Sequence, residues 1–323
     1  MTRHILLYSA ANFSSGGGKA VEQYGVSVVI PSYNRRDAVV RALDSVLSQD
    51  YPNLECIVVD DASTDGSGEM LRGLAGDREA LRVIELEQNT GQGAARNVGA
   101  RAARGQWVCF LDSDDELLPG SIESRVSVFV EDPDFDGIAF GGNIVAGKSE
   151  VLLPGSVEKG EDISLQDYLK DRGWLHTNAF MISRERFLEL DGFREDLRQK
   201  QDVEFFIRAL CRVHARYCGQ ACSRMHDLGD VRARNHHERI ARQGYRFIDA
   251  VRTNPEVQER VEPDLLKDLV SRGVSTYLSA LYRTGQHSQF RKALRRSVRQ
   301  GELSPSSRWL KRYLLSWLRS PSN

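Results

Sequence analysis

The chain contains 323 residues, which is enough for one large domain or for one domain with an appendage. Its formal net charge of −1 gives no indication of nucleic-acid binding, and no apolar run is long enough to cross a membrane as a helix. Because the five cysteines form no CxxC pair, we expect a reducing, cytoplasmic environment.

Residues 1–25 precede the first clear strand. The stretch RHILLYS reads as a strand, and the SSGGG that follows at 14–18 reads as a flexible loop. The apolar run ILLYSAA is short for a signal peptide. We expect residues 1–25 to form either an added edge strand or a disordered arm.

From residue 26 onward, runs rich in Val and Ile alternate with segments of helical periodicity. Apolar strands joined by helical crossovers form parallel sheets that are covered on both faces. We therefore predict an α/β domain with a mostly parallel central sheet, and a mixed part of that sheet at its last strand. The predicted strands are 26–30, 55–60, 82–86, 107–111, 137–142 and 178–183, and the predicted helices are 37–49, 68–74 and 93–104.

After about residue 235 the chain becomes basic and helical, with no good strand. Helices are predicted at 270–283 and 289–299, around the turn Thr284-Gly285. In the last segment, RWLKRYLLSWLR, one apolar stripe faces away from Lys311, Arg312 and Arg319. This stripe either packs on the rest of the protein or lies on an anionic membrane surface, such as the inner face of the plasma membrane. Its residues are Trp309, Leu310, Tyr313, Leu314, Trp317 and Leu318.

Polar residues follow four of the predicted strands, at the point where each strand ends. In an open parallel sheet, ligands bind outside the carboxyl ends of the strands. One polar strand end is only a loop, but four that converge on one edge indicate a ligand site. These polar ends are residues 31–34, 60–63, 89–91 and 112–115.

Asp112 and Asp114 form a D-x-D pair directly after the apolar strand WVCFL. Clustered carboxylates repel one another unless a cation neutralises them. Mg²⁺ or Mn²⁺ binds one or two carboxylates and completes its shell with phosphate oxygens and water. The pair therefore favours a metal-bound diphosphate substrate over the alternative, a solvated acidic turn.

A dinucleotide-binding fingerprint is the rival interpretation of the same region. Gly91 and Gly93 lie between a strand and a helix, and Asp112 follows about 20 residues later. Arg96, however, stands in the place of the third glycine, where a side chain would separate helix from strand. An NAD-dependent enzyme is thus an alternative with a weaker basis.

Two stretches resemble family 2 glycosyltransferases of the GT-A fold. They are VSVVIPSYNRRDAVVRALDSVLSQDYPNLECIVVDDASTDGS and NTGQGAARNVGARAARGQWVCFLDSDDELLPGSIE, and the similarity is dense from residue 26 to 123. It continues more weakly through 176–210 and fades after about 235. The resemblance implies a GT-A catalytic domain at 26–235, with a helical basic extension at 236–323.

The resemblance also implies an inverting, metal-dependent transfer of a sugar from a UDP-sugar. By position, Pro31 and Tyr33 would line the nucleoside pocket, with Tyr33 stacked on the base. Asp61 would accept a hydrogen bond from a uracil-like base, and Arg96 and Asn97 would border the nucleotide. The acceptor is expected to be a growing surface glycan or a lipid-linked one. A non-catalytic nucleotide-binding scaffold is the second hypothesis.

By the same resemblance, Asp112 would contact the ribose or a metal-bound water, and Asp114 would ligate Mn²⁺ or Mg²⁺. His226, in SRMHDLGDVRAR, is a candidate further ligand of the metal or the diphosphate, and a solvated basic loop is its alternative. The candidate partners of the phosphate oxygens are Arg224, Arg232 and Arg234.

Asp202 is the expected general base. The family has a Glu-Asp pair after a GGF-like turn, and here the turn is Asp191-Gly192-Phe193 and the pair is Gln201-Asp202. A nucleoside diphosphate leaves without a protein acid, so one carboxylate that activates the acceptor hydroxyl suffices. Without the family pattern, a helix N-cap would be the preferred interpretation of Asp202. His176 and Asn178 are expected on the acceptor side.

Overall fold

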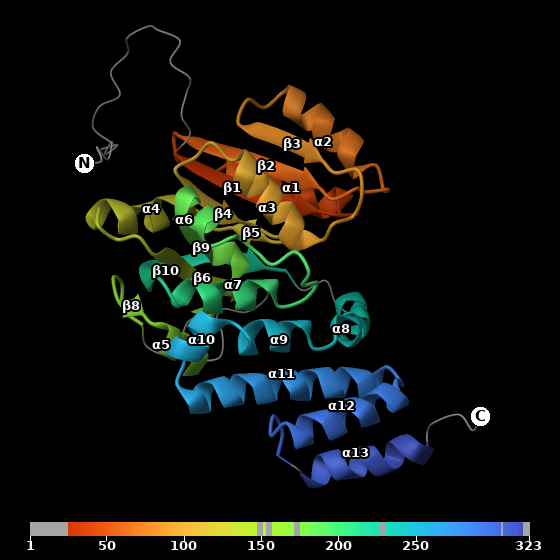
Figure 1. Cartoon of the computed structure of the whole chain (residues 1–323). Coiled ribbons are helices and arrows are strands. Elements are labelled where there is room, and N and C mark those ends of the chain that lie inside the picture. The colour runs from red at the N-terminus through yellow and green to blue at the C-terminus, as the bar shows by residue number, and fades with distance from the viewer. Residues whose placement is uncertain are drawn as a thin grey trace, which may run out of the picture.

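A ten-stranded mixed sheet forms the centre of the computed structural model, and helices cover both of its faces (Figure 1). The structure describes residues 25–146, 151–152, 157–170, 175–226, 230–304 and 306–318. Apart from Gly25, the segment predicted as an edge strand or an arm lies outside the described residues.

One half of the sheet is parallel, as predicted, in the strand order β3-β2-β1-β4. Every predicted strand and crossover helix of this half is present, with bounds that differ by a few residues. The strands are β1 (Val26–Ser32), β2 (Leu54–Asp60), β3 (Leu81–Glu85) and β4 (Trp107–Phe110). The crossover helices are α1 (Arg36–Leu47), α2 (Ser67–Gly76) and α3 (Gln92–Ala102).

The other half of the sheet is mixed. Strand β9 (Phe180–Ser183) runs antiparallel to both β4 and β6 (Ile138–Val145), which confirms the predicted mixed part. The strand was predicted to begin at residue 178, but residues 177–179 form a 3₁₀ turn and the strand begins at Phe180. Strand β10 (Ala215–Met225), parallel to β6, was not predicted. The short strands are β5 (Glu116–Leu117), β7 (Val151–Leu152) and β8 (Asp162–Ile163).

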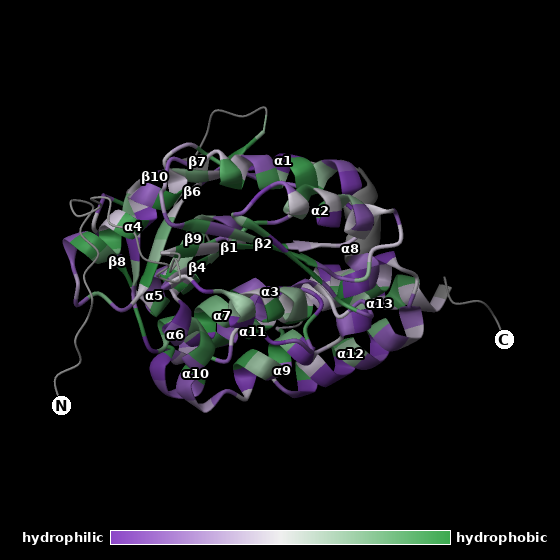
Figure 2. Cartoon of the chain, turned by 90° about the horizontal axis from the view of Figure 1, so that it is seen from above, coloured by the Kyte–Doolittle hydropathy of each residue, from purple (hydrophilic) through white to green (hydrophobic). Residues whose placement is uncertain are grey.

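The helices form two layers, seen in Figure 2 on either side of the strands. On one face, α1, α2 and α4 (Ser121–Glu131) bury their apolar residues in one hydrophobic cluster. On the other face, a second cluster includes residues of α3, α5 (Leu165–Lys170), α6 (Arg184–Glu189) and α7 (Gln201–Leu210). The helices α3 and α7 therefore lie in the same layer, next to the loops that follow β3 and β4.

The C-terminal region is helical, as predicted, and it packs on the second layer. The hydrophobic cluster that contains Ala95 of α3 continues without a break to Trp309 near the C-terminus. The predicted domain boundary at residue 235 lies inside α8, so one helix joins the two parts. The helices are α8 (Asp230–Gln243), α9 (Arg246–Arg252), α10 (Pro255–Arg260), α11 (Pro263–Arg283), α12 (His287–Arg299) and α13 (Ser307–Leu318).

The predicted stripe of α13 is divided in the structure. Trp309 is buried against α12, whereas Leu310, Leu314 and Trp317 are 55% to 60% exposed. Arg312, expected on the solvated side, instead lies over the rings of Tyr282 and Trp309. Part of the stripe therefore packs on the protein, and the rest of its described residues lie at the surface. Among the described helices, none combines the length and the apolar content that crossing a bilayer requires.

Candidate active site at the carboxyl edge of the sheet

The loops that follow the parallel strands are joined to one another by hydrogen bonds. After β1, the side-chain oxygen of Asn34 accepts from the backbone N–H of Thr64, in the loop after β2, at 2.8 Å. Asp61, at the end of β2, accepts from the backbone N–H groups of Thr90 and Gly91 after β3, at 2.7 and 2.8 Å. The polar strand ends therefore meet at one edge, as the sequence indicated.

The residues expected around a nucleoside lie at this edge. Tyr33 is 44% exposed although it is a large aromatic residue, and Pro31 lies within β1 beside Val59 of β2. Asp61 is buried and uses both carboxylate oxygens to hold the loop after β3. Its predicted contact with a base stays a prediction, and any such contact would use a remaining lone pair of these oxygens.

Three carboxylates form a cluster after β4. Asp112, Asp114 and Asp115 each offer an oxygen, and these oxygens lie within 4.8 Å of one another. Asp114 and Asp115 are buried, and Asp112 is partly exposed. Burial and the charge of Asp112 raise the pKa of Asp115 to about 6. This arrangement suits a divalent cation, because a bound cation would remove the repulsion that the cluster otherwise carries.

Asn178 holds the cluster from behind. Its side-chain oxygen accepts from the backbone N–H of Asp112 at 2.8 Å, and its amide nitrogen donates to the Asp115 carboxylate at 2.7 Å. Asn178 has no exposed surface, and its acceptor contact stays a prediction. The ring of His176, which is partly buried, accepts from the Asn178 backbone N–H at 3.3 Å. The acceptor contact of His176 stays a prediction.

His226 lies beside the cluster without being part of it. Its backbone N–H donates to Asp115 at 2.8 Å, and its ring Nε2 lies 2.6 Å from Glu116 Oε2. Arg224 lies 3.8 Å from the same Glu116 oxygen. The metal or diphosphate contact of His226 stays a prediction. The side chains of Arg232 and Arg234 lie outside the described part of the chain.

Two arginines that we did not single out from the sequence also contact the cluster. Arg35 Nε lies 3.8 Å from the Asp114 carboxylate, and Arg41 donates to the Asp114 backbone oxygen at 2.8 Å. Both arginines follow the end of β1 within ten residues. Their position after a strand end was the only sequence feature that could have indicated a place in the site. They place positive charge next to the candidate diphosphate site.

Arg96 connects the cluster to the helix that carries Asp202. Its buried guanidinium donates to Asp112 at 2.5 Å. With its amide turned so that the oxygen faces the donors, Gln201 accepts from Arg96 at 3.2 Å and donates to the Leu197 backbone oxygen at 2.8 Å. Gln201, at the start of α7, is thus a support of the site that the sequence did not reveal.

The dinucleotide alternative loses its basis in the packing of α3. The close approach of this helix to β1 occurs at Gly99, where a Cβ atom would lie 2.3 Å from Val29 Cγ1. Arg96 lies one turn earlier and directs its side chain toward Asp112. The helix therefore packs closely on the strand at Gly99, about one turn beyond Arg96, which holds the place of the third glycine in the fingerprint.

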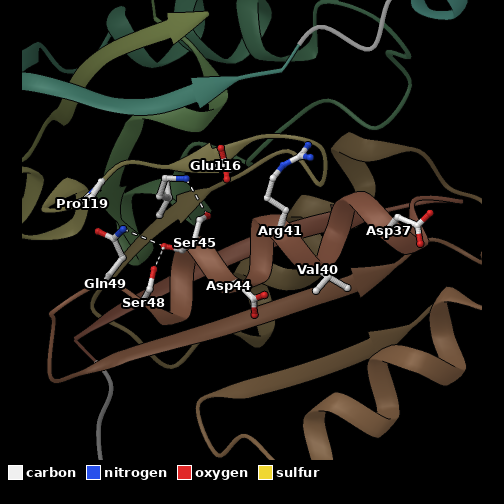
Figure 3. A pocket seen from close by; sticks show the side chains of 10 residues that line it. Asp37, Val40, Arg41, Asp44, Ser45, Ser48, Gln49, Glu116 and Pro119 are labelled. Atoms are coloured by element: carbon white, nitrogen blue, oxygen red, sulfur yellow. Dashed lines mark hydrogen bonds between the residues drawn. The ribbon is translucent and has the colours of Figure 1, made fainter. Parts of the chain in front are cut away.

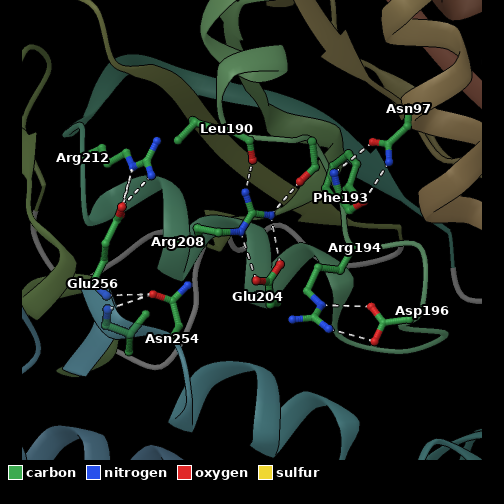
Figure 4. Close-up of polar contacts among 12 residues, drawn as sticks. Asn97, Leu190, Phe193, Arg194, Asp196, Glu204, Arg208, Arg212, Asn254 and Glu256 are labelled. Carbon is green, nitrogen blue, oxygen red and sulfur yellow. Dashed lines mark hydrogen bonds and ion pairs between the residues drawn. The ribbon is translucent and has the colours of Figure 1, made fainter.

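The turn before α7 is fixed by side chains from two helices (Figure 4). Asn97 of α3 donates to the Phe193 backbone oxygen at 2.7 Å and accepts from its N–H at 2.9 Å. Arg208 of α7 donates to the Gly192 backbone oxygen at 2.6 Å and pairs with Glu204 at 3.0 Å. Asn97 is buried and both ends of its amide are used, so it supports the turn. Its predicted place beside the nucleotide stays a prediction.

Asp202 is the second residue of α7 and is partly exposed. The N-cap position belongs to Lys200, so the N-cap interpretation of Asp202 is wrong. Within the described part of the chain, the Asp202 carboxylate makes no hydrogen bond. Its role as general base stays a prediction.

Packed aromatic rings lie beneath the site. Phe110 of β4, Phe193 of the turn and Phe205 of α7 contact one another in sequence, with ring centroids 5.2 and 5.0 Å apart. Each such pair contributes about 0.5–1.5 kcal/mol beyond its burial. These contacts connect the acidic cluster, the turn and the Asp202 helix in one rigid base.

A groove of about 620 Å³ runs along the outer face of α1 (Figure 3). Asp37, Asp44 and Gln49 line it, and so do Arg41 and Glu116, which contact Asp114 and His226 respectively. None of the three clustered aspartates lines the groove. The groove therefore lies beside the acidic cluster. Two of its lining residues, Arg41 and Glu116, also contact residues in or next to that cluster.

A family model described as Glycosyl transferase family 2 matches residues 27–188. The putative teichuronic acid biosynthesis glycosyltransferase TuaG of Bacillus subtilis (strain 168) is 32% identical over 199 residues, or 61% of this chain and 76% of TuaG. The succinoglycan biosynthesis protein ExoO of Rhizobium meliloti (strain 1021) is 40% identical over 101 residues. That second match covers 31% of this chain and 28% of ExoO.

Among solved structures, the crystal structure of S. aureus TarS 1-349 in complex with UDP-GlcNAc has a similar fold. Its TM-score is 0.61 at 20% sequence identity, and the match covers 83% of this chain and 81% of that one. The matched portion of this chain extends well beyond residues 27–188, so the shared fold includes part of the C-terminal region.

Proposed function

This chain belongs to glycosyl transferase family 2, with the GT-A fold, and we propose that it transfers a sugar from a UDP-sugar to an acceptor hydroxyl. The acidic cluster at the carboxyl edge of the sheet is the observation that carries this proposal. TarS was solved with UDP-GlcNAc, which supports a UDP-sugar donor. The names of TuaG and ExoO support an acceptor in surface polysaccharide biosynthesis, either a growing glycan or a lipid-linked one.

Asp112 and Asp114 would hold Mn²⁺ or Mg²⁺. Both oxygens of Asp115 accept hydrogen bonds from Asn178 and His226, which leaves the other two aspartates as the better ligands. When bound, the cation would neutralise the diphosphate as it leaves. Arg96 orients Asp112, and Asn178 fixes the backbone at the same residue. His226 would join the donor site by exchanging its contact with Glu116 for one with the metal or the diphosphate.

Asp202 would act as general base. Its carboxylate would take the proton of the acceptor hydroxyl while the oxygen forms a bond to the anomeric carbon. The bond from that carbon to the diphosphate breaks on the opposite face, so the configuration inverts. One carboxylate suffices, because the nucleoside diphosphate leaves as a stabilised anion.

Pro31, Tyr33 and Asp61 would bind the nucleoside, with the exposed Tyr33 ring stacked on the base. Aromatic stacking of this kind is worth about 1–3 kcal/mol per base. Asn97 would border the nucleotide through the turn that it supports. His176 would lie toward the acceptor.

Release of UDP from UDP-GlcNAc and other UDP-sugars, measured with Mn²⁺ and without acceptor, tests this function. We expect wild type to release UDP slowly, because water can replace the acceptor, and Asp202→Asn to bind Mn²⁺–UDP without turnover. A wild type that binds Mn²⁺–UDP but releases none from any UDP-sugar would support a non-catalytic scaffold. A wild type that binds no UDP at all would contradict both.

We also propose that α13 lies on an anionic membrane surface at the inner face of the plasma membrane. Its exposed residues Leu310, Leu314 and Trp317 are spaced to share one helical face. Helices α12 and α13 carry several exposed cations, and α13 contains no acidic residue. Figure 1 shows α13 at the end of the molecule that lies farthest from β1 and β2. These exposed cations include Lys292, Arg295, Arg299, Arg308 and Lys311.

A further inference from the structure

Two cysteine thiols that the proposed mechanism does not use lie side by side in β10. The Sγ atoms of Cys218 and Cys222 are 3.6 Å apart, and both residues are buried. The structure describes all five cysteines of the chain, and no other pair of their sulfur atoms is in contact. Because the two sulfur atoms already touch, a small movement of the side chains would bring them to the distance of a disulfide.

An irregular segment of β10 brings these two thiols together. In a regular strand, residues four apart in the sequence lie about 13 Å from each other. Here six steps along β10, from Tyr217 to Ser223, correspond to three steps along β6, from Phe140 to Asn143. Gly219 has φ 93°, in the left-handed region that favours glycine. The extra residues form a bulge that shortens the strand, and this bulge makes the two thiols a pair.

The bulge is fixed by contacts with the start of α4. Cys222 Sγ lies 3.9 Å from the Ser121 backbone oxygen and 3.8 Å from Ser124 Oγ. Gln220, between the two cysteines, donates to the Gly120 backbone oxygen and to Ser124 Oγ, both at 2.9 Å. These contacts hold the bulge in the conformation in which the two thiols meet.

The surroundings of the two thiols make them unequal. The contact between them lowers the pKa of the Cys218 thiol and raises the pKa of the Cys222 thiol. The positive charge of the buried Arg125, on α4, favours the thiolate form of both. Cys218 also adjoins the exposed Gly219, whereas Cys222 has no exposed surface. Cys218 is therefore the better nucleophile of the two, because the thiolate is the reactive form of cysteine.

We propose that Cys218 and Cys222 are a modification site, at which hydrogen peroxide forms a reversible disulfide. The Cys218 thiolate attacks one peroxide oxygen, the O–O bond breaks, and the leaving hydroxide takes up the proton that Cys218 had released. The Cys222 sulfur then attacks the sulfenic acid at Cys218, the S–O bond breaks, and the leaving hydroxide takes the Cys222 proton. Two electrons pass from the thiols to the peroxide, which becomes two molecules of water. A dithiol reductant reverses the reaction by thiol–disulfide exchange.

Mass spectrometry of the peroxide-treated full chain tests this proposal. The reduced protein is treated with hydrogen peroxide, and the remaining thiols are then alkylated in guanidinium chloride. Trypsin cleaves after Arg216 and Arg224, so residues 217–224 form one peptide that contains both cysteines. We expect this peptide to carry no alkyl label and to be lighter than the reduced peptide by two hydrogen atoms. Treatment with dithiothreitol before alkylation should restore both labels.

Serine variants assign the roles of the two thiols. Cys222→Ser removes the second thiol, so dimedone should label a sulfenic acid that persists at Cys218. Cys218→Ser should leave the Cys222 thiol unlabelled, because this thiol is fully buried and its pKa is raised. Cys211→Ser is the matched control, since it removes a buried cysteine that has no thiol neighbour, and it should form the same disulfide as wild type.

The rate of oxidation in the wild type decides between a reactive pair and two inert core residues. Cys218 and Cys222 should lose their labels at least about tenfold faster than Cys211 loses its own. If the peptide keeps both labels, or loses them no faster than Cys211 does, the proposal is overturned. This comparison needs no variant, so it holds even if a serine variant does not fold. It also needs no glycosyltransferase activity, so its outcome is independent of the proposed function.

Discussion

At the scale of single residues, the acidic cluster is the feature with the clearest chemical consequence. Three carboxylates share a small volume, and Asn178 and the His226 backbone hold one of them in place. Hydrogen bonds of this kind fix the geometry but do not remove the repulsion between like charges. A cation does remove it, so metal binding should dominate the behaviour of the cluster.

Asp114→Asn should abolish Mn²⁺-dependent binding of UDP and lower UDP release by about 100-fold or more, because a metal ligand is lost. Calorimetric titration of Mn²⁺ and UDP measures the first effect. Asp50→Asn, which changes an exposed carboxylate elsewhere, should behave as wild type. Equal affinities in both variants would exclude Asp114 as a ligand.

The stability of the metal-free protein should depend on the titration of Asp115. The folded-state pKa is raised from 3.8 to about 6, so the folded protein binds an additional proton between these values. The stabilisation is complete below about pH 4 and is lost as the pH rises through about 6, by up to about 3 kcal/mol. Urea unfolding in EDTA should show this loss in wild type, and Asp115→Asn should lack it.

Saturating Mn²⁺ should restore the lost stability at the upper end of that range, since a cation favours the carboxylate. A difference between wild type and Asp115→Asn that stays flat from about pH 4 to about pH 7 would contradict the assignment.

Some residues of the acidic cluster and its supports were predictable from the sequence, and others were not. The D-x-D spacing at a strand end was sufficient for Asp112 and Asp114. The support from Asn178 depends on a strand paired antiparallel to β4, and no local pattern reports which side chain fills the space behind a loop. The contact between Gln201 and Arg96 likewise joins two helices that only the packing brings together.

At the scale of elements, the contact of α3 with β1 decides where Arg96 lies. Gly99→Ala should destabilise the protein by about 1–3 kcal/mol, because the added methyl group meets Val29 inside a packed core. It should also weaken UDP binding, since α3 carries Arg96. Urea unfolding and UDP titration measure the two effects.

Gly73→Ala is the matched control, since nothing lies within 4 Å of a Cβ atom at this helical glycine. It should be neutral or stabilising by about 1 kcal/mol. If Gly99→Ala were as stable as Gly73→Ala, the close packing of α3 on β1 would be refuted.

The parallel half of the sheet was predictable because each of its strands contains a run rich in Val, Ile or other apolar residues. Strand β10 was not, because ARYCGQACSRM contains small and polar residues and its register with β6 shifts twice. The short strands β5, β7 and β8 each contain two residues, too few for any periodicity to appear.

At the scale of the whole molecule, the C-terminal helices extend the core of the catalytic part and end in an exposed apolar face. Leu310→Asp with Trp317→Asp should abolish flotation with phosphatidylglycerol vesicles, because both apolar contacts and local charge balance are lost. Wild type should float with these vesicles at low salt and not with phosphatidylcholine alone.

Val130→Asp is the control, since it changes an exposed apolar residue on α4. It should float as wild type does. If wild type stays unbound, no membrane covers α13. If instead wild type forms a dimer that the α13 double variant disrupts, a second copy of the chain covers it.

The domain boundary predicted at residue 235 was based on composition, because the chain becomes basic and helical near that residue. The packing shows no boundary there, because α8 runs through residue 235 and the hydrophobic cluster continues past it. Composition reports charge and solvent exposure along the chain, whereas the extent of a core depends on which apolar faces meet.

The most direct test of the account is an anomalous difference map from crystals of the full chain soaked with Mn²⁺ and UDP. We predict a manganese peak within coordination distance of Asp114 or Asp112, with the diphosphate on the same ion and the uracil beside Tyr33. A nucleotide bound elsewhere, with the three carboxylates free of metal, would contradict it.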